Sequence, residues 1–276
     1  MSPLWRDEVG AYLSPHRLCL VRMKRGVRPT SVAEHEQRLE SVKGDSFGAV
    51  LEAFGALLAQ SPWHGTATRV VLADHWARYA IVPWVASLGS TQERLAHGRQ
   101  LLVGLYGEAV EGWDARISEA PPGAARVVCA VPAELIAAVR ATCAEHGSAI
   151  LSLQPQLVAA YESWRPCLPT SNAWFVSVEQ GSLAAARFGR NGWDRVHGVR
   201  IGLDWMRELK RLQTFGRLAS STPEEGQVYV DAPHAWREVA AGSVGMADAN
   251  SLQWLEEPQG PMTTLQRLGR TRRLAA

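Results

Sequence analysis

The sequence predicts an α/β fold made of two lobes of similar organisation, and three observations lead to this prediction. The chain has 276 residues, more than the roughly 100–200 of an ordinary domain. Strand-like and helix-like segments alternate along it. Near residue 172 the opening pattern begins again, with strands that are joined by tight turns and lead into helices. A lobe boundary at 166–172 follows, with a first lobe over 1–165 and a second over 166–276.

The elements of the first lobe follow from apolar runs of two kinds. Short runs between turn-forming residues predict strands, and longer runs with helical spacing predict helices. Ser90 or Thr91 is a suitable N-cap for the helix that follows it. Pro132 is suited to the first turn of the next helix, and Gly147 is suited to the end of that helix. A hairpin is expected around Asp74-His75-Trp76. The strands are predicted over 9–13, 17–23, 27–32, 69–73, 77–82, 116–118, 126–131 and 149–153, and the helices over 47–60, 92–113, 132–146 and 155–164.

The second lobe repeats the opening of the first. Strands are predicted over 174–178, 183–188, 193–201 and 227–231, with turns at 179–182 and 189–192. An amphipathic helix is predicted over 203–218, because Leu203, Met206, Leu209, Leu212 and Phe215 share one face. The final segment, 260–276, is weakly patterned.

Charge and composition exclude several classes of protein. Lys and Arg number 29 against 27 Asp and Glu, a formal net charge of +2, which is too balanced for a dedicated nucleic-acid-binding protein. There is no secretory signal and no apolar stretch of about 18–20 residues that could span a bilayer. The cysteines lack zinc-ligand spacing, so they are interpreted as small buried residues in a reducing compartment. These are Cys19, Cys129, Cys143 and Cys167. A cytoplasmic protein without a metal site is predicted.

Sequence motifs of common enzymes do not occur. There is no phosphate loop, dinucleotide-binding glycine motif, nucleophile elbow or zinc-protease motif. The neighbours Asp74 and His75 are interpreted as turn residues rather than as a catalytic pair. The 11 tryptophans are spread evenly, which favours core and protein-contact roles over stacking on single-stranded nucleic acid.

Four stretches resemble the actin-like cytoplasmic platform proteins of type IV pili and type II secretion systems, the group that contains PilM and the cytoplasmic half of GspL. They are 9–23, 126–132 with the helix after it, 150–164 and 174–201. The resemblance implies a two-lobed actin-like fold, which is a duplicated ribonuclease H-like fold. ATP-binding members of this superfamily carry an Asp-x-Gly turn in each lobe, where glycine admits the phosphates and the acid positions Mg²⁺.

The corresponding turns of this chain depart from that pattern. Ser14-Pro15-His16 has neither acid nor glycine, and Pro15 has no N–H to donate. Glu179-Gln180-Gly181 keeps a glycine, but an amide stands between it and the acid. Gly242, in 241–245, is a candidate remnant of the adenosine-contacting segment. A pseudo-ATPase without catalytic residues or cofactor is therefore expected, with residual ATP and Mg²⁺ binding left open.

The resemblance implies a non-enzymatic scaffold in a bacterial pilus- or secretion-type assembly platform. Such a scaffold would bind a short cytoplasmic peptide of a bitopic inner-membrane protein and would lie at the inner membrane through that partner, without inserting. The scaffold could also form a homodimer. Four arginines near the end of the sequence are candidate contacts to a partner or to an anionic membrane surface. They are Arg267, Arg270, Arg272 and Arg273. The alternatives are an actin-like ATPase, including a sugar-kinase-like enzyme, and a filament-forming segregation protein.

Overall fold

A computed structural model describes most of the chain. The described residues are 7–24, 30–39, 47–189, 192–202, 204–218, 226–233, 236 and 252–255. The chain divides into two compact units, which are described separately. Within the described residues, unit 1 comprises 7–76 and 133–163, and unit 2 comprises 77–132 and 164–255. The lobe boundary at 166–172 stays a prediction.

Unit 1 is built on a five-stranded sheet in the order β3-β2-β1-β4-β8. The first three strands form an antiparallel meander, and β4 and β8 continue the sheet in parallel with β1. A parallel neighbour needs a crossover connection, and helices supply it. The bounds are β1 Glu8–Leu13, β2 Arg17–Lys24, β3 Thr30–Arg38, β4 Ala67–Leu72 and β8 Ile150–Pro155.

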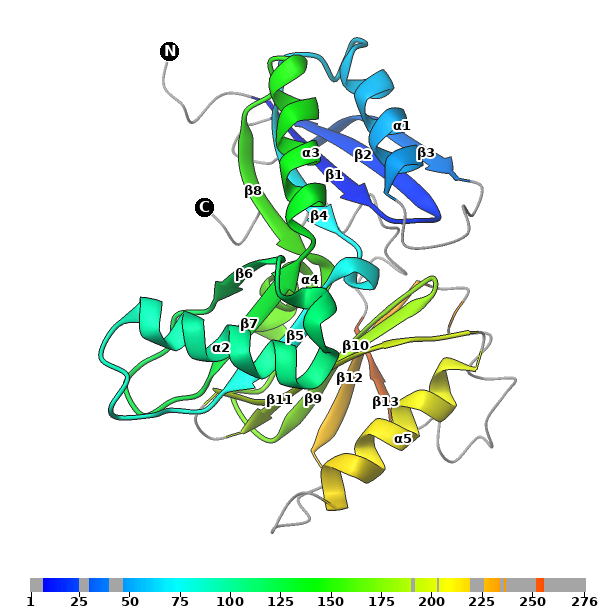
Figure 1. The fold of residues 1–276 in the computed structure, drawn as a ribbon. Helices are drawn as coiled ribbons and strands as arrows, with labels where there is room; N and C mark the ends of the chain where they lie inside the picture. The colour runs from blue at the N-terminus through cyan, green and yellow to red at the C-terminus, as the bar shows by residue number, and fades with distance from the viewer. Residues whose placement is uncertain are drawn as a thin grey trace. The chain divides into compact units, whose positions relative to one another are not determined.

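Two helices of unit 1 lie on the same side of this sheet (Figure 1). They are α1, Gly48–Leu58, and α3, Ala133–Glu145. Each buries an apolar stripe, with Val50, Phe54 and Leu58 on α1 and Leu135, Val139 and Cys143 on α3. Gly147, at φ 64°, follows α3, so the predicted glycine end of that helix is confirmed. The helix α4, Gln156–Trp164, follows β8 directly.

Unit 2 contains a second five-stranded sheet, β11-β10-β9-β12-β13, with the same order and the same strand directions as the sheet of unit 1. The helix α5, Trp205–Leu218, packs on one face of it, where Met206, Leu209 and Leu212 are buried. The bounds are β9 Ala173–Glu179, β10 Ser182–Gly189, β11 Gly192–Arg200, β12 Gln227–Asp231 and β13 Leu252–Trp254. The repetition predicted from the sequence is therefore confirmed at the level of strand order.

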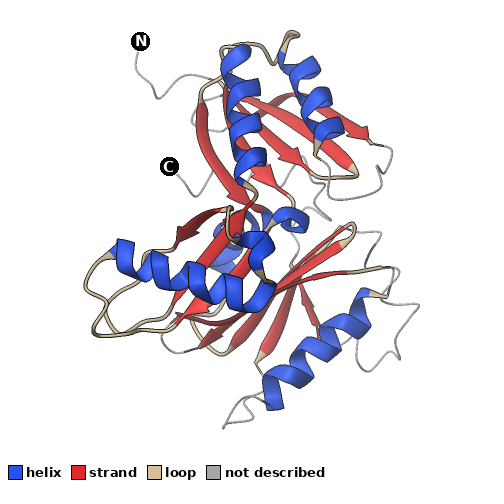
Figure 2. Ribbon diagram, viewed as in Figure 1, coloured by secondary structure: helices blue, strands red, loops and turns tan. Residues whose placement is uncertain are grey.

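Unit 2 also holds a three-stranded antiparallel sheet, β5-β7-β6, which is inserted in the sequence between β4 and α3. Its strands are β5 Arg78–Val82, β6 Asp114–Ile117 and β7 Arg126–Val131. The helix α2, Thr91–Tyr106, covers one face, where Ala80, Val82, Val128 and Leu102 form the core. Ser90 is the N-cap of α2 and forms a capping box with Glu93. Of the two N-cap candidates that the sequence offers, Ser90 and Thr91, the first is therefore confirmed. Figure 2 shows the alternation of helices and strands in both units.

Two predictions of local structure are wrong, and a third has shifted bounds. The strands β4 and β5 form no hairpin but belong to different sheets, because the short 3₁₀ helix Asp74–Trp76 redirects the chain between them. The strand predicted over 27–32 is present as β3, Thr30–Arg38, a polar edge strand that extends further along the chain, and residues 27–29 lie outside the described residues. The helix predicted over 92–113 ends at Tyr106, where Gly107 adopts φ 79°.

The prediction that the four cysteines are buried is confirmed for Cys19 and Cys143, but Cys129 is half-buried and Cys167 is exposed, so for Cys167 it is wrong. All four lie in the described residues, and none forms a disulfide. Cys19 on β2 and Cys143 on α3 are buried. Removal from water disfavours the thiolate, and it raises the pKa of Cys19 to about 12 and that of Cys143 to about 11. These two side chains are packing residues rather than nucleophiles.

Candidate functional site

The turn between β1 and β2 uses its polar groups within itself. The backbone N–H of Ser14 donates to the carbonyl oxygen of Arg17 at 3.0 Å, and the Ser14 hydroxyl donates to the same oxygen at 2.9 Å. Pro15 has no N–H. Two of the three backbone positions in Ser14-Pro15-His16 are therefore unavailable to a phosphate group. The buried Ser14 side chain is directed at Arg17, the first residue of β2.

The turn between β9 and β10 has a different character. Glu179 ends β9 with only 5% of its surface exposed, and the Ser182 hydroxyl donates to its Oε2 at 2.9 Å. Gly181 adopts φ 85°, a left-handed conformation that L side chains rarely adopt. Gln180 is exposed. This turn retains a buried carboxylate and a glycine, the two features that the first turn lacks.

Each five-stranded sheet carries a buried aspartate where its fourth strand ends. Asp74 follows β4, and Asp231 is the last residue of β12. Asp231 pairs in register with Ser177 of β9, and Glu179 lies two residues further on the same face of that strand. Ser177, Glu179 and Asp231 are all at least nine-tenths buried. Unit 2 therefore places two acids and a serine together at the carboxyl ends of parallel strands, where α/β sheets commonly bind ligands.

Asp74 has a structural task in unit 1. Its Oδ1 accepts a hydrogen bond from the backbone N–H of Leu157, at the start of α4, at 3.1 Å, and its surface is 4% exposed. A carboxylate at a helix N-terminus satisfies an N–H that has no partner within the helix and interacts favourably with the helix dipole. The interpretation of Asp74 as a turn residue therefore missed its role as the anchor of α4.

Replacing Asp74 tests this role. Asp74→Ala should lower the free energy of unfolding by about 2 kcal/mol, because the buried Leu157 N–H loses a charged acceptor. Asp74→Asn keeps an acceptor oxygen, so its free energy of unfolding should fall by less than that of the alanine variant. Urea denaturation of the two variants and the wild type measures the difference. An alanine variant as stable as the wild type would show that the contact does not hold α4.

The structure brings together only part of the residues predicted as a site. Ser14, Pro15 and His16 lie in one turn of unit 1, and Glu179, Gln180 and Gly181 lie in one turn of unit 2. Gly242 and the four arginines at 267, 270, 272 and 273 lie outside the described residues. Sequence reasoning set Asp74 aside as a turn residue and overlooked Asp231. The available signal was an acid directly after a buried apolar run, in Val70-Val71-Leu72-Ala73-Asp74 and in Val228-Tyr229-Val230-Asp231.

The first turn does not fit the Mg²⁺–nucleotide that actin-like ATPases bind. It offers no carboxylate, and its Ser14 N–H already donates to Arg17. In the second turn, one oxygen of Glu179 accepts the Ser182 hydroxyl. Among the described residues no group of three His, Cys, Asp or Glu side chains is arranged to hold a metal ion.

Comparison with known proteins identifies the architecture. No protein-family model matches the sequence, and no curated protein sequence matches it. Solved structures do match. A PilM–PilN type IV pilus biogenesis complex aligns at a TM-score of 0.65 and 14% identity, covering 98% of each chain. The cytoplasmic domain of Epsl, an inner membrane component of the type II secretion system of Vibrio cholerae, aligns at 0.62 and 12%, covering 98% of this chain and 94% of that one.

A third match agrees with the first two. A Bacteroides thetaiotaomicron protein of unknown function with an actin-like ATPase fold aligns at a TM-score of 0.61 and 11% identity, covering 100% of this chain and 99% of that one. Within the described part of the chain, no helix is both long enough and apolar enough to cross a membrane. The chain therefore has the actin-like fold, and its architecture resembles those of the type IV pilus biogenesis and type II secretion structures.

Proposed function

We propose that this protein is a non-enzymatic scaffold that binds a cytoplasmic segment of a membrane partner in a pilus- or secretion-type assembly. The observation that supports it most is the β1–β2 turn, in which Ser14 and Pro15 leave no cradle for a phosphate. The actin-like fold is kept while the groups for nucleotide chemistry are missing from one of its two turns. The first solved neighbour is itself a complex with a second protein, PilN. The scaffold would lie at the inner membrane through its partner.

The inserted sheet of unit 2 offers a surface for such a segment. Alternate residues of a strand point to opposite faces, so Ile81, Val127 and Cys129 lie on the face that α2 does not cover. All three are half-buried. On that same face Tyr79 is buried against Gly198 of β11, so only the part of the face toward β6 is a candidate surface. Arg116 of β6 pairs in register with Cys129, and 76% of its side-chain surface is exposed. Among the described strands β6 pairs only with β7, so an extended peptide can add to its other edge while the peptide's apolar side chains meet this face.

Co-purification tests the proposal. The tagged full chain should recover a bitopic membrane protein from detergent-solubilised membranes of the cells that naturally produce it. Arg116→Glu should reduce that yield several-fold, because it reverses the charge on the proposed face. Arg99→Glu, an equal charge reversal on the exposed side of α2, serves as the matched control. Recovery of soluble metabolic enzymes alone, or equal loss with both variants, would contradict the proposal.

A further inference from the structure

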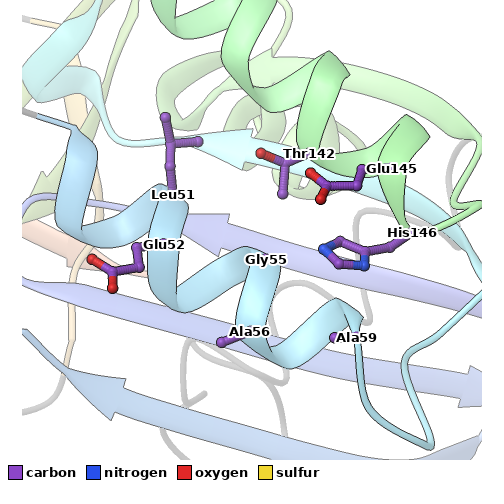
Figure 3. A pocket seen from close by; sticks show the side chains of 8 residues that line it. All are labelled: Leu51, Glu52, Gly55, Ala56, Ala59, Thr142, Glu145 and His146. Carbon is purple, nitrogen blue, oxygen red and sulfur yellow. The ribbon is translucent and has the colours of Figure 1, made fainter.

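The five-stranded sheet of unit 1 is buried on both faces, but α1 and α3 lie on only one of them (Figure 1). Figure 3 shows these helices side by side, and a Cβ at Gly55 of α1 would stand 3.4 Å from the Thr142 methyl carbon of α3. The near face of the sheet is the one that these two helices cover, and the far face is the opposite one. The far face therefore needs a cover of its own.

Two hydrogen bonds identify the residues of the near face. The hydroxyl oxygens of Thr68 on β4 and of Ser148, shortly after α3, lie 2.7 Å apart. The Arg22 side chain on β2 donates to the carbonyl oxygen of Pro62, shortly after α1. Val9 of β1 pairs in register with both Thr68 and Arg22, so these three residues share the near face. Alternate residues of a strand point to opposite faces, so the next residues along each strand belong to the far face.

The far face is covered on three of its strands. Six of its residues on β1, β2 and β4 are at most 6% exposed. On the neighbouring strand β3, Glu34 and Glu36 share this face and are exposed, so the cover ends at β2. The six buried residues are Glu8 and Tyr12 of β1, Cys19, Val21 and Met23 of β2, and Val71 of β4.

The helix α4 lies at one end of the far face. The backbone N–H at its start donates to Asp74, which follows β4, and Glu162 further along it still accepts a hydrogen bond from Gln154 of β8 at 3.1 Å. Both contacts hold α4 at the carboxyl end of β4. Glu8 and Met23 pair at the opposite end, about 17 Å away along β1. Among the helices that the structure describes in unit 1, none is therefore placed over that end of the far face.

The stretch 260–276 has the sequence of a covering helix. Pro261 is suited to a first helical turn. Met262, Leu265 and Leu268 recur every three residues, which keeps them on one side of a helix. A helix over this stretch would be about 25 Å long, more than the roughly 17 Å that β1 spans. It could therefore bury the far face from end to end.

The other stretches outside the described residues that adjoin the strands of unit 1 are poorer covers. The stretches 25–29 and 40–46 each contain one large apolar residue, a valine. The first six residues contain Leu4 and Trp5 and lead toward β1 at Glu8. An extended stretch turns only alternate side chains toward a sheet, so these six residues could bury one end of the far face but not both.

We infer that the stretch 260–276 docks as a helix on the far face of the unit 1 sheet and packs Leu265 and Leu268 against β1 and β2. The opposite side of this helix carries Arg267 and Arg270. The leucines then serve as the anchor, and docking holds the two arginines on the surface of unit 1. The contacts predicted for these arginines, with a partner or an anionic membrane surface, would take place there.

Maleimide labelling of buried cysteines in the full chain tests the inference. Cys19 lies on the far face, whereas Cys143 is buried on α3, on the other side of the sheet. The substitutions Cys129→Ser and Cys167→Ser leave these two thiols, and mass spectrometry measures their labelling rates separately. Cys143 is thus an internal control for unfolding of unit 1 as a whole.

Leu265→Asp/Leu268→Asp should raise the labelling rate of Cys19 by about tenfold or more, because two buried charges would release the helix. The labelling rate of the control thiol should not change. The matched variant Thr263→Asp/Thr271→Asp adds the same charge on the side of the helix that carries the arginines, and it should label as the wild type does. Unchanged labelling of Cys19 in the leucine variant, or equal acceleration in both double variants, would overturn the inference.

A second measurement covers the case in which the leucine variant unfolds. Equal acceleration at Cys19 and Cys143 would indicate loss of the whole unit. A chain that ends at Gln259 is then labelled with and without a synthetic peptide of residues 260–276. The peptide should restore the protection of Cys19, and failure to restore it would overturn the inference.

The variant Leu4→Asp/Trp5→Asp tests the rival cover in the same assay. It should leave the labelling rate of Cys19 as in the wild type. Faster labelling in this variant, together with wild-type rates in the leucine variant, would assign the far face to residues 1–6 and overturn the inference.

Discussion

Gly226→Ala should lower the free energy of unfolding by about 3 kcal/mol. A Cβ at Gly226 would lie 2.6 Å from the carbonyl oxygen of Asn172 and 3.1 Å from the Cα of Ala173. Both are backbone atoms at the start of β9, so the clash cannot be relieved by turning a side chain. The substitution must push β12 away from β9, with which all five residues of β12 pair in the second sheet.

Urea denaturation compares this variant with Gly202→Ala. A Cβ at Gly202 meets no atom within 4 Å, so this control should stay within about 0.5 kcal/mol of the wild type. If Gly226→Ala proved as stable as its control, the backbones of β12 and β9 could not approach each other as closely as described at Gly226.

Gly98→Leu should be similarly damaging to unit 2, with a loss of about 3 kcal/mol. Gly98 is buried where α2 crosses the inserted sheet, and a Cβ there would lie 3.1 Å from Val82 and 3.2 Å from Val128. A leucine would have to lift the helix from the sheet and separate Leu102 from its apolar neighbours. Reduced thermal stability and loss of amide protection in β5 and β7 are the expected readouts.

The matched control lies on the same helix. Gly104 is exposed and a Cβ there meets nothing within 4 Å. Gly104→Ala should therefore stabilise the protein by about 0.5–1 kcal/mol through helix propensity alone. Equal effects of the two substitutions would mean that α2 does not pack on the sheet through Gly98.

Local signals predicted most elements of this fold. The β1–β2 and β9–β10 pairs were found because their apolar runs are short and are separated by turn-forming residues. The partners of β4 and β5 could not be found in this way, because a run such as 69–73 does not indicate which sheet its strand joins. Strand β13 was not predicted, because three residues are too few to show the alternation of apolar and polar side chains that marks a strand. The inserted sheet between β4 and α3 is a tertiary arrangement that no local pattern encodes.

The candidate site shows the same limit. The departure of Ser14-Pro15-His16 from an acid-x-glycine turn could be read directly, because it depends on residue types. The hydrogen bonds of Ser14 to Arg17 and the meeting of Ser177 with Asp231 depend on strand register. Asp74 was assigned to a turn because its partner, the Leu157 N–H, lies 83 residues away.

Thermal unfolding in the presence of Mg–ATP tests the central claim, that this actin-like chain is a scaffold rather than an ATPase. A ligand that binds only the native state adds RT ln(1 + [L]/Kd), about 2.7 kcal/mol at a hundredfold excess over Kd, and Tm rises accordingly. With ADP as the control, the account predicts no change in Tm at millimolar nucleotide. A clear rise that depends on Mg²⁺ would show that the altered turns still hold phosphate, and it would contradict the claim.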